Sequence, residues 1–113
     1  MTEKEVFQMV KSIGFPAAYH HFDEGESPEP PFVVYLYPGT NNFSADGTVY
    51  QGINQLDIEL YTDKKDLEAE HKVDAVLKKH GFFYEKNETY IESEKMYEVI
   101  YEMEVLISEQ KQN

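Results

Sequence analysis

The stretch LDIEL, residues 56–60, decides the fold that this sequence predicts. Its three aliphatic side chains alternate with the carboxylates of Asp57 and Glu59. A period of two residues is that of a β-strand with one apolar and one polar face. The apolar face must be buried against other elements, which places the two carboxylates on the opposite side of a sheet.

Two further runs have strand character. Residues 32–37 (FVVYLY) are β-branched or aromatic throughout, as in a buried strand. They are joined to a returning strand, residues 48–61, by a turn-rich segment that ends in Asp46-Gly47. We expect residues 32–37 to pair with residues 56–60. Residues 96–107 alternate in the same way and predict the last strand of the sheet.

Helix signals flank these runs. Thr2 and Glu5 have the spacing of a capping box and predict a helix over residues 3–13, stopped by Gly14. Asp66 can cap a second helix, which Gly81 would end.

The apolar stripe of the second helix needs a partner, and the aliphatic face of residues 56–60 is the best one available. We therefore expect Val73, Val76 and Leu77 to pack onto Leu56, Ile58 and Leu60.

Shorter elements complete the chain. Residues 17–22 are a weak strand candidate, and residues 23–31 predict a loop without a place in the core. After the second helix we expect a short strand at 82–85, a turn at 86–88 and another short strand at 89–92. The whole chain, residues 1–113, is then one α+β domain, an antiparallel sheet with two helices on one face.

The charge balance limits the partners. The chain has 10 Lys and Arg residues against 22 Asp and Glu residues, a net charge of −12. This opposes binding to nucleic acid phosphates and to anionic membranes. It favours solubility, a basic partner, or a surface that repels DNA. Without cysteine, disulfides and thiolate metal sites are excluded. No run is long and apolar enough for a membrane span, and residues 1–8 do not have a secretory signal pattern, so we expect a cytoplasmic protein.

The residues show no catalytic constellation. His20 and His21 are adjacent, and neighbours in a strand point to opposite faces, so they should not share a metal ion. The carboxylates have no companion nucleophile, Arg clamp or Gly-rich phosphate loop. We expect no enzyme activity, no metal and no cofactor.

Three stretches resemble a known family: FVVYLYPGTNNFSADGTVY (32–50), LDIELYTDKKDLEAE (56–70) and YIESEKMYEVIYEMEVLIS (90–108). They are similar to small tail-completion proteins of phages and prophages of Gram-positive bacteria, which resemble the tail terminators of long-tailed phages. The resemblance covers residues 16–108.

The resemblance implies a structural role. Such proteins form rings, usually hexameric, at the head-proximal end of the tail tube, where they stop tube growth and help to join the head. The implied partners are further copies of the chain, the tail tube and the head–tail connector proteins. The implied location is the bacterial cytoplasm during assembly and then the virion tail. The family has no catalytic motif to transfer.

Two sets of residues are candidates for these contacts. The segment 38–47 is long for a hairpin connection and carries an apolar residue among small polar ones, so it is a candidate partner-binding element, unless Phe43 packs back onto its own domain. The second set consists of three glutamates in the last strand. We expect these glutamates to gather on one face of the sheet and to border a channel through the ring, along which DNA passes. An alternative function is an acidic DNA mimic that blocks a DNA-binding protein. The candidate residues are Pro38, Asn41, Asn42, Phe43 and Asp46 for partner binding, and Glu98, Glu102 and Glu104 for the channel.

Overall fold

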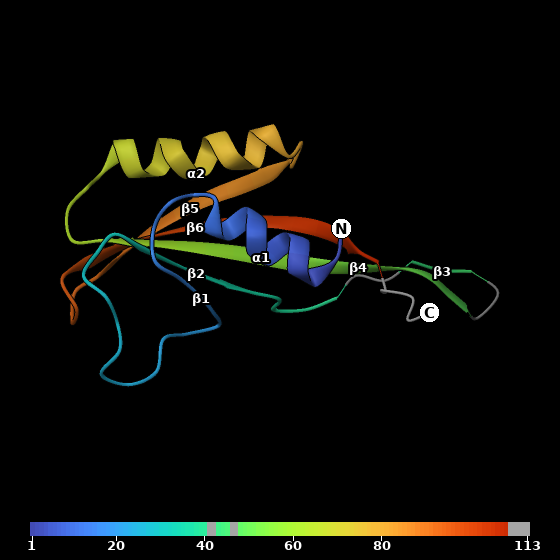
Figure 1. Ribbon diagram of the computed structural model, residues 1–113, viewed down its shortest axis with the longest axis horizontal. Coiled ribbons are helices and arrows are strands. Elements are labelled where there is room, and N and C mark those ends of the chain that lie inside the picture. The colour runs from blue at the N-terminus through green and yellow to red at the C-terminus, as the bar shows by residue number, and fades with distance from the viewer. Residues whose placement is uncertain (41–42, 46–47, 109–113) are drawn as a thin grey trace.

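The computed structural model describes residues 1–40, 43–45 and 48–108, and for residues 43–45 and 48–51 it describes the backbone alone. Both helices contribute to one core on the same face of the sheet (Figure 1), and the predicted α+β fold is confirmed. The elements are, in chain order, α1 (Glu3–Lys11), β1 (Ala17–Tyr19), β2 (Phe32–Leu36), β3 (Phe43–Ala45), β4 (Thr48–Thr62), α2 (Leu67–Lys79), β5 (Tyr84–Ile91) and β6 (Met96–Ile107).

The sheet has the strand order β1-β2-β4-β6-β5, and β3 pairs with the outer part of β4. β2 pairs antiparallel with β4, with Val33 opposite Leu60 and Tyr35 opposite Ile58, which confirms the predicted pairing. One pair differs from the expected antiparallel sheet, because β1 runs parallel to β2. Residues 20–31 carry the chain back to the end of the sheet where β1 began, and such a return connection is what parallel neighbours need.

The core lies where the aliphatic face of β4 meets the helices. Leu56, Ile58 and Leu60 are all 0% exposed, and they belong to one buried cluster with Val73 and Leu77 of α2. Val76 is half-buried and packs against that cluster. The predicted residues of α2 and β4 therefore share one core. Direct packing of α2 onto the aliphatic face of β4 stays a prediction.

The helix ends follow their local signals. The Thr2 hydroxyl accepts from the N–H of Glu5 at 3.1 Å, and the Glu5 carboxylate accepts from the N–H of Thr2 at 3.0 Å. Asp66 accepts from the N–H of Ala69 at 3.0 Å, and Gly81 has the positive φ of a helix stop, +77°. α1 ends at Lys11, two residues before the predicted end at residue 13.

The prediction for residues 82–92 was wrong. β5 is one strand, Tyr84–Ile91, and pairs with β6 without a register shift. The turn lies at residues 92–95, where Lys95 has a left-handed backbone at φ 53°.

The polar residues that suggested a turn inside β5 have partners on α2 and on β6. Lys86 lies 2.9 Å from Oε1 of Glu70, and the side-chain amide of Asn87 donates to Glu102 at 2.9 Å. These contacts lie between residues far apart in the chain, so the local composition could not reveal them.

The outer part of β4 extends beyond the region that the helices cover, and β3 lies along it (Figure 1). Gly39 and Thr40 lead toward it, since the C=O of Gly39 accepts from the N–H of Gln55 at 2.8 Å and Thr40 bridges to Asn54.

Candidate functional site

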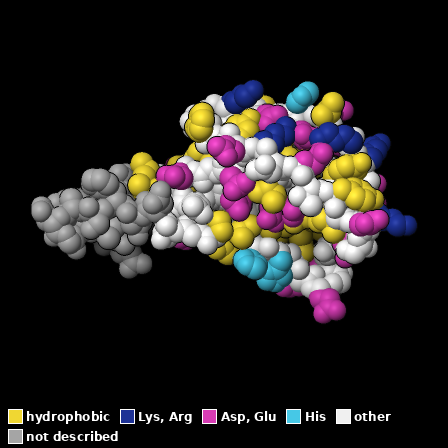
Figure 2. Space-filling view, turned by 180° about the vertical axis from the view of Figure 1, so that it is seen from behind, with side chains coloured by type: hydrophobic (Ala, Val, Ile, Leu, Met, Phe, Trp, Pro, Cys, Tyr) yellow, Lys and Arg dark blue, Asp and Glu magenta, His cyan; other side chains and the backbone are white. Residues whose placement is uncertain are grey.

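A row of three carboxylates crosses the face of the sheet that lies opposite the helices. Asp57 of β4 is directly opposite Glu102 of β6, and Glu102 is directly opposite Glu85 of β5. Residues in such positions have Cβ atoms about 4.5–5.5 Å apart, so like charges there repel one another. Figure 2, seen from behind, shows Asp and Glu side chains over the middle of the view and Lys side chains toward its upper and right margins.

A second acidic group lies farther along the same strands. The Tyr61 hydroxyl lies 2.5 Å from Oε2 of Glu98 and 2.9 Å from Oε1 of Glu59. A phenol has one hydrogen to donate, so it satisfies one carboxylate at a time. The other contact is favourable only when its carboxyl group carries a proton.

The acidic face disfavours ionisation of Asp57 and Glu59. Burial raises the pKa of Asp57, and repulsion from Glu102 adds to this effect. Burial also raises the pKa of Glu59, to which Glu98 and Asp57 add, while the hydrogen bond from Tyr61 and the nearby His20 act in the opposite direction. Asp57 and Glu59 therefore bind protons more readily than isolated carboxylates would.

The sequence-predicted acidic residues lie on this one face. Glu98, Glu102 and Glu104 lie on one face of β6, with Ile100 between Glu98 and Glu102. Glu102 and Glu104 are exposed, while Glu98 is half-buried. Asp57 and Glu59 share the face, as predicted, because β4 and β6 pair without a slip. Whether the face borders a channel stays a prediction.

The candidate partner-binding residues are only partly described. Pro38 is exposed just after β2. Asn41, Asn42 and Asp46 lie outside the described residues, and so does the side chain of Phe43, whose backbone belongs to β3. Their role in binding stays a prediction.

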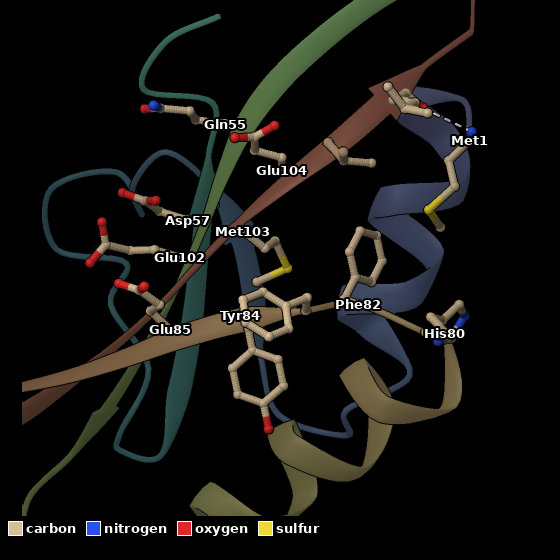
Figure 3. A pocket seen from close by; sticks show the side chains of 14 residues that line it. Met1, Gln55, Asp57, His80, Phe82, Tyr84, Glu85, Glu102, Met103 and Glu104 are labelled. Atoms are coloured by element: carbon tan, nitrogen blue, oxygen red, sulfur yellow. Dashed lines mark hydrogen bonds between the residues drawn. The ribbon is translucent and has the colours of Figure 1, made fainter. Parts of the chain in front are cut away.

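A cavity of about 760 Å³ opens at the sheet edge where α2 ends and β5 begins. Sequence reasoning missed it, because residues from four separate segments form it. Figure 3 shows carboxylates on one side of the ribbon of β6 and apolar side chains on the other. The acidic side has Gln55, Asp57, Glu85, Glu102 and Glu104, and the apolar side has Met1, Phe82, Tyr84 and Met103.

The cavity exists because the residues that connect α2 to β5 do not pair with β6. β5 pairs with β6 from Tyr84 onward, opposite Met103, and Phe83 is 89% exposed. The mixed lining of the cavity would accept a cationic group with an apolar stem, such as a lysine or arginine side chain.

The histidine pair lies differently from the expectation. β1 ends at Tyr19, and His20 has a left-handed backbone at φ 68°. The two rings therefore meet, with the Nδ1 atoms of His20 and His21 3.0 Å apart, instead of pointing to opposite faces. Among the described residues, no group of three or more potential ligands could hold a metal ion.

A buried carboxylate fixes α2 to its surroundings. Glu70 is 3% exposed, and its oxygens lie 2.7 Å from Nζ of Lys65 and 2.9 Å from Nζ of Lys86. Burial opposes ionisation, but the two lysines outweigh it and lower the pKa of Glu70. These contacts join α2 to the preceding loop and to β5, which gives the network a structural role.

Compared with models of protein families and with curated proteins, the chain matches none of them. Within the described part of the chain, no helix is long and apolar enough to cross a membrane. The residues themselves therefore carry the argument for function.

Proposed function

We propose that this chain is a non-enzymatic structural component of a phage or prophage tail. Several copies form a ring at the head-proximal end of the tail tube, which ends the tube and helps to join the head. Its contacts are with itself, with the tube and with the head–tail connector proteins. It acts in the host cytoplasm during assembly and stays in the virion tail. The resemblance of residues 16–108 is the starting point.

The observation that carries the proposal is the row Asp57–Glu102–Glu85 on the face opposite the helices. Like charges in such positions destabilise a sheet. A function for these carboxylates would explain why the chain retains them. A surface that borders a channel for DNA benefits from negative charge, because that charge repels the phosphates.

A genetic experiment tests the tail role. The coding sequence is deleted from the phage or prophage that carries it, and lysates are examined by electron microscopy. We expect heads without tails and tail tubes of uneven length, with normal virions restored by the gene in trans. Normal virions from the deletion would overturn the proposal.

A charge experiment tests the channel. The triple variant Glu98→Gln, Glu102→Gln and Glu104→Gln should assemble but retain DNA at low salt, because the lost repulsion is electrostatic and screened by salt. A matched control removes the same charge from exposed glutamates elsewhere, and it should release DNA normally. The control variant is Glu68→Gln, Glu92→Gln and Glu94→Gln.

The same face supports a second candidate function, a DNA mimic that inhibits a DNA-binding protein. The favouring observation is that Glu98, Glu102 and Glu104 lie on one face of β6, with Ile100 between the first two, and that Asp57 and Glu85 lie beside them. A mimic would compete with DNA for a basic protein from the host, and the triple variant would lose that competition. If the protein is a tail component, it should show no such competition. Deletion of its gene should then give defective tails.

A further inference from the structure

β5 forms an open edge of the sheet. It is the last strand in the order β1-β2-β4-β6-β5 and pairs on one side with β6. Its eight residues contain no proline, and no register shift interrupts its pairing. A long edge of this kind is a template for another strand, and proteins usually shorten, bulge or charge such edges.

The direction of the backbone groups along β5 follows from its neighbour. The C=O of Leu106 accepts from the backbone nitrogen of Met1 at 2.9 Å, and the N–H of Ser108 donates to the C=O of Met1 at 2.7 Å, on the edge of β6 away from β4. Even-numbered residues of β6 therefore direct their backbone groups toward β5. Ile100 and Asn87 form one such hydrogen-bonded pair by register.

The alternation then assigns the outward groups. Odd-numbered residues of β5 bond to β6, so the N–H and C=O of even-numbered residues point away from the sheet. No hydrogen bond from another described residue reaches these groups. The outward residues are Tyr84, Lys86, Glu88 and Tyr90.

The charges on these outward residues are held within their own chain. Lys86 contacts Glu70 at 2.9 Å and Asp74 at 3.5 Å, and Glu88 is paired with Lys65. These contacts hold both side chains over the helix side of the sheet, so they leave the outward backbone groups of the edge open. The edge is thus available for pairing.

A second copy of the chain fits this edge in one register. For two sheets to join with their helices on the same side, even-numbered residues must face even-numbered ones. With Asn87 opposite itself on a two-fold axis, Lys86 faces Glu88 of the other copy, so opposite charges pair. Tyr84 faces Tyr90, and Glu85 faces Thr89.

The neighbouring registers place like charges together. A shift by two residues in one direction puts Lys86 opposite Lys86 of the second copy, and a shift in the other direction puts Glu88 opposite Glu88. Like charges directly opposite one another are destabilising. Charge complementarity therefore selects the register centred on Asn87.

We propose that two copies of this protein pair through β5, antiparallel and with Asn87 on the two-fold axis, to form one sheet that continues across both copies. The interface is isologous, so it closes after two copies. It differs from the head-to-tail contacts of a ring and goes beyond the proposed tail role. It gives the protein a paired state of its own, separate from assembly on a tail tube.

Single-cysteine crosslinking tests the register, because the chain has no cysteine of its own. Asn87 would form a non-hydrogen-bonded pair with its copy, with Cα atoms about 4.5 Å apart, which is within the range that a disulfide spans. Asn87→Cys should give a covalent dimer on oxidation. Glu85→Cys and Thr89→Cys should stay uncrosslinked alone and form a dimer when mixed.

A charge pair at position 89 tests the same register without a crosslink. Thr89→Lys should tighten the dimer and Thr89→Glu should weaken it, because residue 89 of each copy faces Glu85 of the other, and this pair occurs twice in the dimer. We expect their dissociation constants to differ by about threefold or more, measured by light scattering across concentration, with circular dichroism to check folding. Equal crosslinking by all three cysteine variants, equal dissociation constants, or a monomer at every concentration would overturn the proposal.

Discussion

The hydroxyl of Tyr101 donates to the backbone C=O of Glu70 at 3.3 Å, in the centre of the protein. Tyr101 is 0% exposed, so the contact joins the middle of β6 to the first turns of α2 without access to water. It is a buried hydrogen bond between two elements that the sequence keeps apart by 31 residues.

Removal of that hydroxyl should weaken the fold. Tyr101→Phe keeps the ring and loses the hydrogen bond, which should lower the free energy of unfolding by about 1 kcal/mol. Tyr101→Ala, which also leaves a cavity, should cost about 3–5 kcal/mol. Urea unfolding followed by circular dichroism measures both. Equal losses for the two variants would mean that the ring contributes nothing.

The burial of the apolar face of α2 in the common core should dominate the contribution of this helix to stability. Leu77 is 0% exposed and Leu67 is 58% exposed on the same helix. Leu77→Ala should lower the free energy of unfolding by about 2–5 kcal/mol. Leu67→Ala should change it by about 0.5 kcal/mol or less. Chemical denaturation of both variants is the measurement, and a Leu77→Ala loss as small as that of Leu67→Ala would contradict the packing.

The Glu70 network should stabilise the protein only when its carboxylate is ionised. The pKa of Glu70 is lowered in the folded state, so its contribution is present above the ordinary value of 4.5 and is lost as pH falls through the folded value. Glu70→Gln should cost about 1–3 kcal/mol at neutral pH, discounted because both lysines are partly exposed. The deficit should shrink in acid. A deficit that is independent of pH would show that the charge is not responsible.

Asp57 should show the opposite dependence on pH. Its pKa is raised in the folded state, so ionisation costs stability at neutral pH and costs none below the ordinary value of 3.8. Asp57→Asn should therefore raise the free energy of unfolding by about 0.2–1 kcal/mol at pH 7 and bring no gain in strong acid. The exposed Asp63→Asn is the control. A gain for both variants alike would point to net charge instead of the Glu102 contact.

The parts of the fold that depend on local signals could be predicted. The capping box at Thr2 and the aliphatic alternation around Ile58 act over a few residues, so they are visible in the sequence. Pairing between β4 and β6 then placed the acidic residues on one face as expected.

The parts of the structure that depend on residues far apart in the chain could not be predicted from the sequence. Residues 86–88 look like a turn until α2 and the loop before it bring Glu70 and Lys65 beside them. The cavity beside Phe83 forms only when the end of α2, the start of β5 and the edge of β6 meet, and no local pattern encodes that meeting.

β4 has a mechanical consequence. Its 15 residues span roughly 50 Å at the usual rise of a strand, so one continuous segment serves both the buried centre and the projecting end beside β3. Its pairing with β6 extends from Gly52 to Thr62. A pull on the projecting end along the strand would load all of these pairs in shear together, instead of opening them one after another. A displacement of the outer end along the strand would therefore be passed to the core through these backbone pairs.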